Sequence, residues 1–110
     1  MSNRHAVGHL ADFELNKPQR FVLDREEIMV VKIGDEIFAV NDVCTHGEVS
    51  LAEGEIIGCS VECWLHGSAF DLRTGKPSGP PATKAIETYT VTVEDVEGNP
   101  TVYVSLEARR

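Results

Sequence analysis

The chain has 110 residues, of which 42% are hydrophobic, so its length and composition fit one globular domain with a modest core, residues 1–110. Its formal net charge of −8 argues against nucleic acid or an anionic membrane surface as a partner, because both need basic patches. No stretch approaches the roughly 20 apolar residues of a membrane-spanning helix, and residues 1–10 contain no apolar signal region, so we expect a soluble, cytoplasmic protein.

Short runs of β-branched and aromatic residues, separated by glycine-containing turns, predict strands along most of the chain. In chain order the predicted strands are residues 20–23, 27–33, 36–41, 55–57, 60–62, 69–72, 88–93 and 101–106. The sequences Gly34-Asp35 and Glu97-Gly98-Asn99-Pro100 predict hairpin turns between neighbouring strands. Only two places have helical potential, both short, near residues 10–15 and 49–53. Strands at this spacing predict an all-β fold, a small antiparallel sandwich or barrel.

Two short motifs pair a cysteine with a histidine, and both fall on predicted loops. Cys44 precedes His46 with one residue between them, Cys63 precedes His66 with two, and a glycine follows each histidine. Two thiolates and two imidazoles form a mixed ligand set of the kind that holds a metal. The sequence therefore predicts a metal site built from two loops.

Two simpler interpretations compete with this one. A structural zinc site also takes two cysteines and two histidines, but the usual spacing groups the cysteines together and then the histidines. Ligand chemistry alone leaves a single zinc ion open. A cysteine activated by a histidine base is a second option, but it gives no reason for the pair to occur twice.

The residues around the motifs resemble the Rieske iron–sulfur family, in which two cysteines bind one iron of a 2Fe–2S cluster and two histidines bind the other. The segments that carry the resemblance are Ile37-Phe38-Ala39-Val40, Gly67-Ser68-Ala69-Phe70-Asp71, Leu72-Arg73-Thr74-Gly75 and Gly79-Pro80-Pro81. The resemblance implies one Rieske-type 2Fe–2S cluster, held in a cluster-binding subdomain of two loops at roughly residues 42–82. Cys44 and Cys63 would bind the inner iron, and His46 and His66 the outer iron.

Two departures place the chain within this family. High-potential members carry an extra cysteine in each loop and join the two in a disulfide, whereas Val49 and Leu65 stand at those positions here. They also have a tyrosine whose hydroxyl bonds a cluster thiolate, where this chain has Phe70. Hydrogen bonds to cluster sulfur favour the reduced form, so the resemblance implies a potential near the low end of the Rieske range, roughly −150 mV.

Three further residues receive roles from the same resemblance. Ser68 would donate a hydrogen bond to a bridging sulfide, and Pro80 would belong to a loop that covers the cluster. Trp64, between two ligands, is expected to shield the cluster rim or to contact partners. By contrast, His5 and His9 are expected to be strand or tail residues rather than ligands.

The resemblance implies an electron carrier and not an enzyme. Its partners would be a flavoprotein reductase and a terminal, ring-hydroxylating-type oxygenase, as for the ferredoxin components of bacterial non-haem iron oxygenase systems. Two alternatives stay open: a small subunit of a larger oxidoreductase such as nitrite reductase, and an accessory or redox-sensing protein in iron–sulfur assembly with Cys59 as the responsive thiol. Cys59 is otherwise expected to be a small buried residue on a strand, with no basic neighbour in sequence to lower its pKa.

Overall fold

The computed structural model describes residues 4–23, 25–43, 49–64, 69–78 and 84–108 of the chain. Within these residues the structure is formed by nine strands and two 3₁₀ turns. Their bounds are β1 Arg4–His9, η1 Leu10–Asp12, β2 Gln19–Leu23, β3 Glu26–Ile33, β4 Glu36–Asn41, η2 Leu51–Glu53, β5 Glu55–Ile57, β6 Ser60–Glu62, β7 Ala69–Asp71, β8 Thr88–Val96 and β9 Asn99–Ala108.

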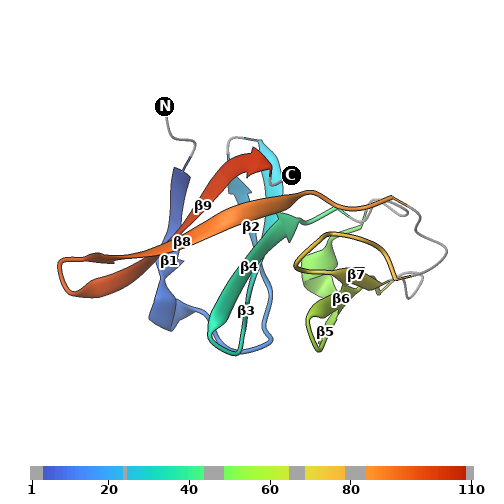
Figure 1. Cartoon of the computed structure of the whole chain (residues 1–110), viewed down its shortest axis with the longest axis horizontal. Helices are drawn as coiled ribbons and strands as arrows, with labels where there is room; N and C mark the ends of the chain where they lie inside the picture. Colours follow the sequence, from blue (N-terminus) through green and yellow to red (C-terminus); the bar gives the residue numbers. More distant parts are fainter. Residues whose placement is uncertain (1–3, 24, 44–48, 65–68, 79–83, 109–110) are drawn as a thin grey trace.

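The strands form two antiparallel sheets. The larger has six strands in the order β1-β9-β8-β4-β3-β2, and the smaller has three in the order β5-β6-β7. Figure 1 shows the small sheet at one end of the molecule, while the β8–β9 hairpin reaches away at the other end. The all-β prediction is therefore confirmed.

The β3–β4 hairpin lies between two apolar clusters. The inter-sheet core packs the larger sheet against the smaller one; its buried members are Met29, Val31, Phe38, Val40, Leu51, Val61, Cys63, Phe70, Leu72 and Ile86. The barrel core fills the larger sheet; its buried members are Phe13, Ile28, Val30, Ala39, Tyr89, Val102 and Val104. Successive residues of a strand point to opposite faces, so a strand buried on both faces reads as a continuous apolar run. That is why residues 28–31 are all apolar and all fully buried.

The larger sheet curls into a nearly closed barrel. Val7 of the edge strand β1 and Phe21 and Leu23 of the opposite edge strand β2 pack against the same barrel core. Two edges of a sheet can share one cluster only when the sheet bends round to bring them together. The small sheet then packs on the outside of this barrel, against β3 and β4.

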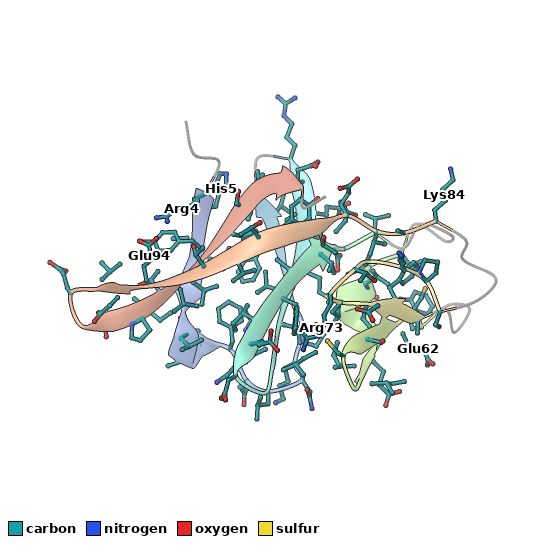
Figure 2. All side chains as sticks on the ribbon, in the orientation of Figure 1. Arg4, His5, Glu62, Arg73, Lys84 and Glu94 are labelled. Atoms are coloured by element: carbon teal, nitrogen blue, oxygen red, sulfur yellow. The ribbon has the colours of Figure 1, made fainter. Side chains whose placement is uncertain are left out.

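Strand β1 was not predicted from the sequence. Its residues are mostly polar or small, and the register against β9 shifts between Ala6 and Gly8. Tertiary contacts hold it in place: Arg4 forms an ion pair with Glu94 of β8 and lies over the ring of Tyr103 of β9, 4.4 Å from its centroid. Arg4 and Glu94 lie side by side in Figure 2.

The other expectations for secondary structure differ in detail. The two places with helical potential form three-residue 3₁₀ turns, η1 and η2. The turn between β8 and β9 is shorter than predicted: Glu97 and Gly98 alone form it, with φ of 51° and 87°, as a two-residue hairpin requires. Pro100 belongs to β9, opposite Asp95. His5 and His9 lie in β1, so of the two expected placements, strand or tail, the strand is the one found.

No helix within the described ranges is long and apolar enough to cross a membrane.

Candidate metal centre

The chain on either side of residues 44–48 is joined by backbone pairing. Val43 and Ser50 form an antiparallel bridge, and the Leu51 N–H donates to the Asp42 carbonyl at 2.6 Å. These two contacts bring the end of β4 to the start of η2. Cys44 and His46 lie outside the described residues, so their positions as ligands remain predictions.

The second ligand segment connects β6 to β7. Glu62 is paired with Ala69, and Cys63 comes directly after Glu62. The Cys63 side chain is fully buried in the inter-sheet core, whereas its neighbour Trp64 is 53% exposed. The chain thus changes from core to surface in one residue. Leu65, His66 and Ser68 lie outside the described residues.

The segment before residues 79–83 contacts strand β7. The Ser78 N–H donates to the Ala69 carbonyl at 2.8 Å, and Phe70 forms a bridge with Pro77. The turn after β7 therefore runs back alongside it before residues 79–83. Pro80, the expected cover of the cluster, belongs to that undescribed stretch.

The flanks of both ligand segments lie in one apolar cluster. Val49 and Leu51, which follow the first segment, and Cys63, which opens the second, all pack in the inter-sheet core. Phe70 is in the same cluster and is fully buried. This packing supports convergence of the four predicted ligands, of which the structure describes Cys63 alone.

The donor groups fit a Rieske cluster. Among the described side chains, no group of three or more histidine, cysteine, aspartate or glutamate residues could hold a metal ion. A thiol as deeply buried as that of Cys63 suits a metal ligand, because the bound metal supplies the positive charge that a buried thiolate needs. Val49 stands at a position where high-potential Rieske proteins have a cysteine, and it is half-buried against the inter-sheet core.

Cys59 does not lie on a strand, which corrects the prediction. It is in the two-residue turn between β5 and β6, after Gly58, whose φ is 58°. A two-residue hairpin with a glycine at its first position leaves the second position at the tip of the turn. Burial raises the pKa of the Cys59 thiol above its ordinary value, and Arg73, which is distant in sequence, partly opposes that rise.

A charged group at the site was missed from the sequence. Asp42, at the end of β4, is 1% exposed. The only signal in the sequence is an aspartate immediately after a strand and two residues before a predicted ligand. Its partners come from other parts of the chain and could not be read from that signal.

The family model for the Rieske [2Fe-2S] domain matches residues 3–90. The chain belongs to the Rieske [2Fe-2S] family. One Rieske-type 2Fe–2S cluster is therefore its cofactor, as the sequence predicted. The match covers both ligand motifs, and it also covers β1 to β7 and the start of β8.

Similar proteins are components of dioxygenase systems. The chain is 37% identical over 91 residues to the anthranilate 1,2-dioxygenase ferredoxin subunit of Burkholderia cepacia. The aligned residues make up 83% of this chain and 84% of that protein. The ferredoxin of carbazole 1,9a-dioxygenase from Nocardioides aromaticivorans IC177 has a similar structure, with a TM-score of 0.87, 31% identity and coverage of 94% and 97% of the two chains. A structure of a complex of reduced oxygenase and oxidised ferredoxin in carbazole 1,9a-dioxygenase matches with a TM-score of 0.84 and 32% identity, over 100% of this chain and 99% of that chain.

Proposed function

We propose that this protein is a one-electron carrier of a multicomponent oxygenase system. It receives electrons from a flavoprotein reductase and delivers them to a terminal oxygenase of the ring-hydroxylating type, and it performs no bond chemistry on a substrate. The observation that carries the proposal is its likeness, over its whole length, to a ferredoxin that is in complex with its oxygenase. A cytoplasmic location is part of the same proposal.

The ligand assignment is part of the proposal. Cys44 and Cys63 hold the inner iron, and His46 and His66 the outer iron. The cluster, when bound, takes up and releases a single electron. The chain supplies ligand geometry, shielding from water and tuning of the potential. Two imidazoles in place of two thiolates make the centre less negative, which raises its potential above that of four-cysteine clusters.

The described part of the site suits this role. Cys63 is fully buried, so its side of the centre is shielded by the inter-sheet core. Trp64 is exposed directly beside it and offers a large apolar surface to a partner protein. A buried inner side and an exposed rim favour electron exchange through the rim.

The experiment that tests the proposal begins with metal analysis of the purified protein. We expect about two irons and about two labile sulfides per chain, and a mixed histidine–cysteine EPR signature after reduction with dithionite. Cys63→Ser and His66→Ala should abolish this signal, while Cys59→Ser, as the matched control, should retain it. Stoichiometric zinc without sulfide would contradict the cofactor assignment.

The partner assignment needs a separate measurement. Stopped-flow mixing with a purified flavoprotein reductase, followed by a terminal oxygenase, should show reduction and then reoxidation of the visible absorbance. Obligate co-purification with a large redox subunit would instead favour the small-subunit alternative.

A further inference from the structure

A buried carboxylate lies where the chain leaves the barrel for the first ligand segment. Asp42 follows β4, and its side chain is 1% exposed. Burying an ionised carboxylate is costly unless charged partners and hydrogen bonds compensate for lost hydration. An apolar residue would fill the same space at lower cost. The presence of an aspartate therefore calls for a role beyond packing.

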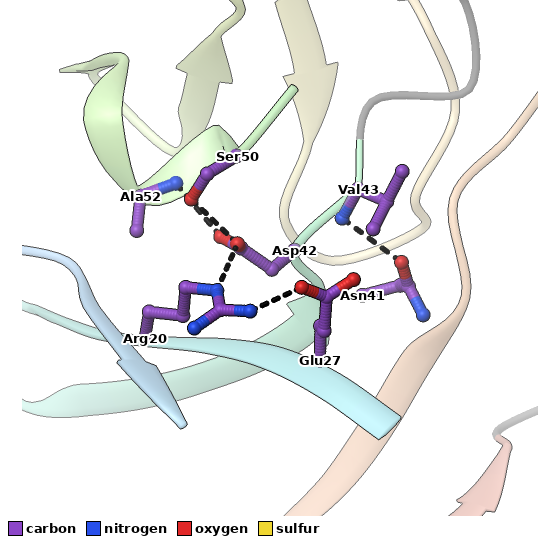
Figure 3. Close-up of polar contacts among 7 residues, drawn as sticks. All are labelled: Arg20, Glu27, Asn41, Asp42, Val43, Ser50 and Ala52. Carbon is purple, nitrogen blue, oxygen red and sulfur yellow. Dashed lines mark hydrogen bonds and ion pairs between the residues drawn. The ribbon is translucent and has the colours of Figure 1, made fainter. Parts of the chain in front are cut away.

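The Asp42 side chain, which precedes residues 44–48, binds two residues that follow them (Figure 3). Its Oδ2 accepts a hydrogen bond from the Ser50 hydroxyl at 2.5 Å, and its Oδ1 accepts one from the Ala52 N–H at 2.8 Å. Ser50 and Ala52 lie after the first ligand segment, whereas Asp42 lies before it. The side chain thus spans the base of that segment.

A cation from the barrel fixes the carboxylate in place. The Arg20 Nε lies 3.2 Å from the Asp42 Oδ2, and the Arg20 guanidinium also pairs with Glu27 of β3. Arg20 belongs to β2 and is partly exposed, so it reaches the buried carboxylate from the surface side. Charge-assisted hydrogen bonds of this kind are stronger and more directional than neutral ones.

Backbone hydrogen bonds lock the same residue. The Asp42 N–H donates to the Glu27 carbonyl at 2.9 Å, and the Asp42 carbonyl accepts from the Leu51 N–H at 2.6 Å. Asp42 is therefore fixed to β3 through its backbone and to η2 through both its backbone and its side chain. Its neighbour Val43 donates its own N–H to the Asn41 side chain at 2.9 Å.

We propose that Asp42 is a positioning residue that fixes the first ligand segment on the barrel. Arg20 orients the Asp42 carboxylate, and this carboxylate binds Ser50 and Ala52, which follow the segment. The proposal rests on the assignment of Cys44 and His46 as ligands under the proposed function. Supporting groups of this kind fix the geometry of metal ligands, and their loss weakens metal binding by about 10- to 100-fold.

A purely structural role gives a different expectation. Removing one partner of a buried ion pair destabilises a protein, whereas replacing both partners with apolar residues of similar size is often neutral. If Asp42 only stabilises the fold, a double apolar replacement should restore the site together with the stability. If Asp42 positions the ligand segment, stability should return but the site should not.

The test compares four variants of the cluster-loaded protein: Asp42→Asn, Ser50→Ala, the double variant Arg20→Met/Asp42→Leu, and the control Glu36→Gln. The control removes a charge and an ion pair at the opposite end of β4, where Glu36 pairs with Arg73. Three quantities are measured: the unfolding temperature by circular dichroism, the rate of cluster loss to an iron chelator well below that temperature, and the EPR spectrum of the reduced protein.

We expect Asp42→Asn to lose its cluster about tenfold faster than the unaltered protein, with a broadened EPR spectrum. Ser50→Ala should change both quantities in the same direction but less, and Glu36→Gln should change neither. The double variant should regain part of the unfolding temperature, because the Ser50 hydroxyl and the Ala52 N–H still lose their acceptor, and it should still lose its cluster quickly. Should Asp42→Asn fail to fold, the double variant and Ser50→Ala decide the matter.

Two results would overturn the proposal. One is cluster loss in the double variant and in Ser50→Ala at the rate of the unaltered protein. The other is cluster loss that follows unfolding temperature alone across all four variants. A Cys44→Ser variant that keeps its iron and its EPR spectrum would overturn the ligand assignment, and this inference with it. The release rates by themselves overturn only the role of Asp42.

Discussion

The Arg73 guanidinium forms two hydrogen bonds with the Glu36 carboxylate, at 2.8 and 3.2 Å. Glu36 begins β4, and Arg73 follows β7, so this pair joins the barrel to the small sheet. The guanidinium also lies over the ring of Phe38, 5.1 Å from its centroid. Arg73 is labelled between β4 and the small sheet in Figure 2. One side chain thus contacts both parts of the structure through its charge and its flat face.

The pair gives stability a defined dependence on pH. The hydrogen bond from Arg73 lowers the pKa of Glu36 below its ordinary value of 4.5. Because the folded pKa is the lower one, the contribution of the pair is fully present above 4.5 and is lost as the pH falls through the folded pKa. We expect the unfolding temperature of the unaltered protein to fall towards that of Glu36→Gln as the pH drops below 4.5, as scanning fluorimetry would measure. An equal gap between the two proteins at every pH would contradict this account.

The thiol of Cys59 should react slowly. Burial is the main cause that raises its pKa above the ordinary value of 9.0, and Arg73 opposes this without reversing it. The thiolate is the reactive form, so the rate of alkylation by iodoacetamide in the loaded protein should rise with a midpoint above pH 9.0. Arg73→Met should move that midpoint higher still, because it removes the nearby positive charge.

Cys59→Ser serves as the control, since it should abolish the labelling assigned to this residue. A midpoint below 9.0 would mean that Arg73 prevails over burial. Such a result would favour the redox-sensing alternative, which needs a thiol with a lowered pKa. The raised pKa counts against that alternative.

Patterns local in sequence predicted most of the fold. The apolar run at residues 28–31 and the turn at Gly34-Asp35 identify the β3–β4 hairpin without any knowledge of the rest of the chain. Strand β1 was missed because its polar residues are ordered by β9 and by the contacts of Arg4. Its pairing is a tertiary effect, and propensity does not encode it.

The same distinction applies to the site. The ligand motifs are local and were evident, whereas the groups that support them are not. Asp42 forms an ion pair with Arg20 of β2, and the positive charge near Cys59 is that of Arg73, after β7. In each contact two strands lie between the two residues in the sequence, and no spacing rule predicts the contact.

Phe70→Tyr should raise the midpoint potential. Phe70 is fully buried in the inter-sheet core, which also contains the predicted ligand Cys63. A hydroxyl that donates to cluster sulfur favours the reduced form. Protein-film voltammetry or a redox titration followed by EPR would measure the shift. Rieske potentials range from about −150 to about +300 mV across the family, and several factors set them. One added hydrogen bond should therefore raise the potential by only a small part of that range.

Phe38→Tyr is the matched control for this prediction. Phe38 is also buried in the inter-sheet core, but it lies on β4 with its ring against the Arg73 guanidinium, six residues before Cys44. The same added hydroxyl should leave the potential unchanged there. If Phe70→Tyr left the potential unchanged or lowered it, the hydrogen-bond account of the low potential would be wrong.

Electron transfer from the reductase should slow as salt rises. Glu55 of β5 and Glu62 of β6 are directly opposite each other, and Glu62 immediately precedes the buried Cys63. Like charges in this position destabilise a sheet, and Glu62 is two residues before the exposed Trp64, so we expect the pair to attract a basic partner. Attraction between surface charges weakens over a Debye length of about 8 Å at physiological salt.

Glu62→Gln isolates the contribution of this pair. It should reduce the association rate at low salt and flatten the dependence on salt, because electrostatic guidance acts mainly on association. It should also raise the unfolding temperature slightly, since it relieves the repulsion with Glu55. Asp95→Asn, an equal loss of charge on the distant β8–β9 hairpin, is the control (Figure 1). If both variants changed the rate equally, net charge would be responsible, and the surface around Trp64 would have no special part in partner docking.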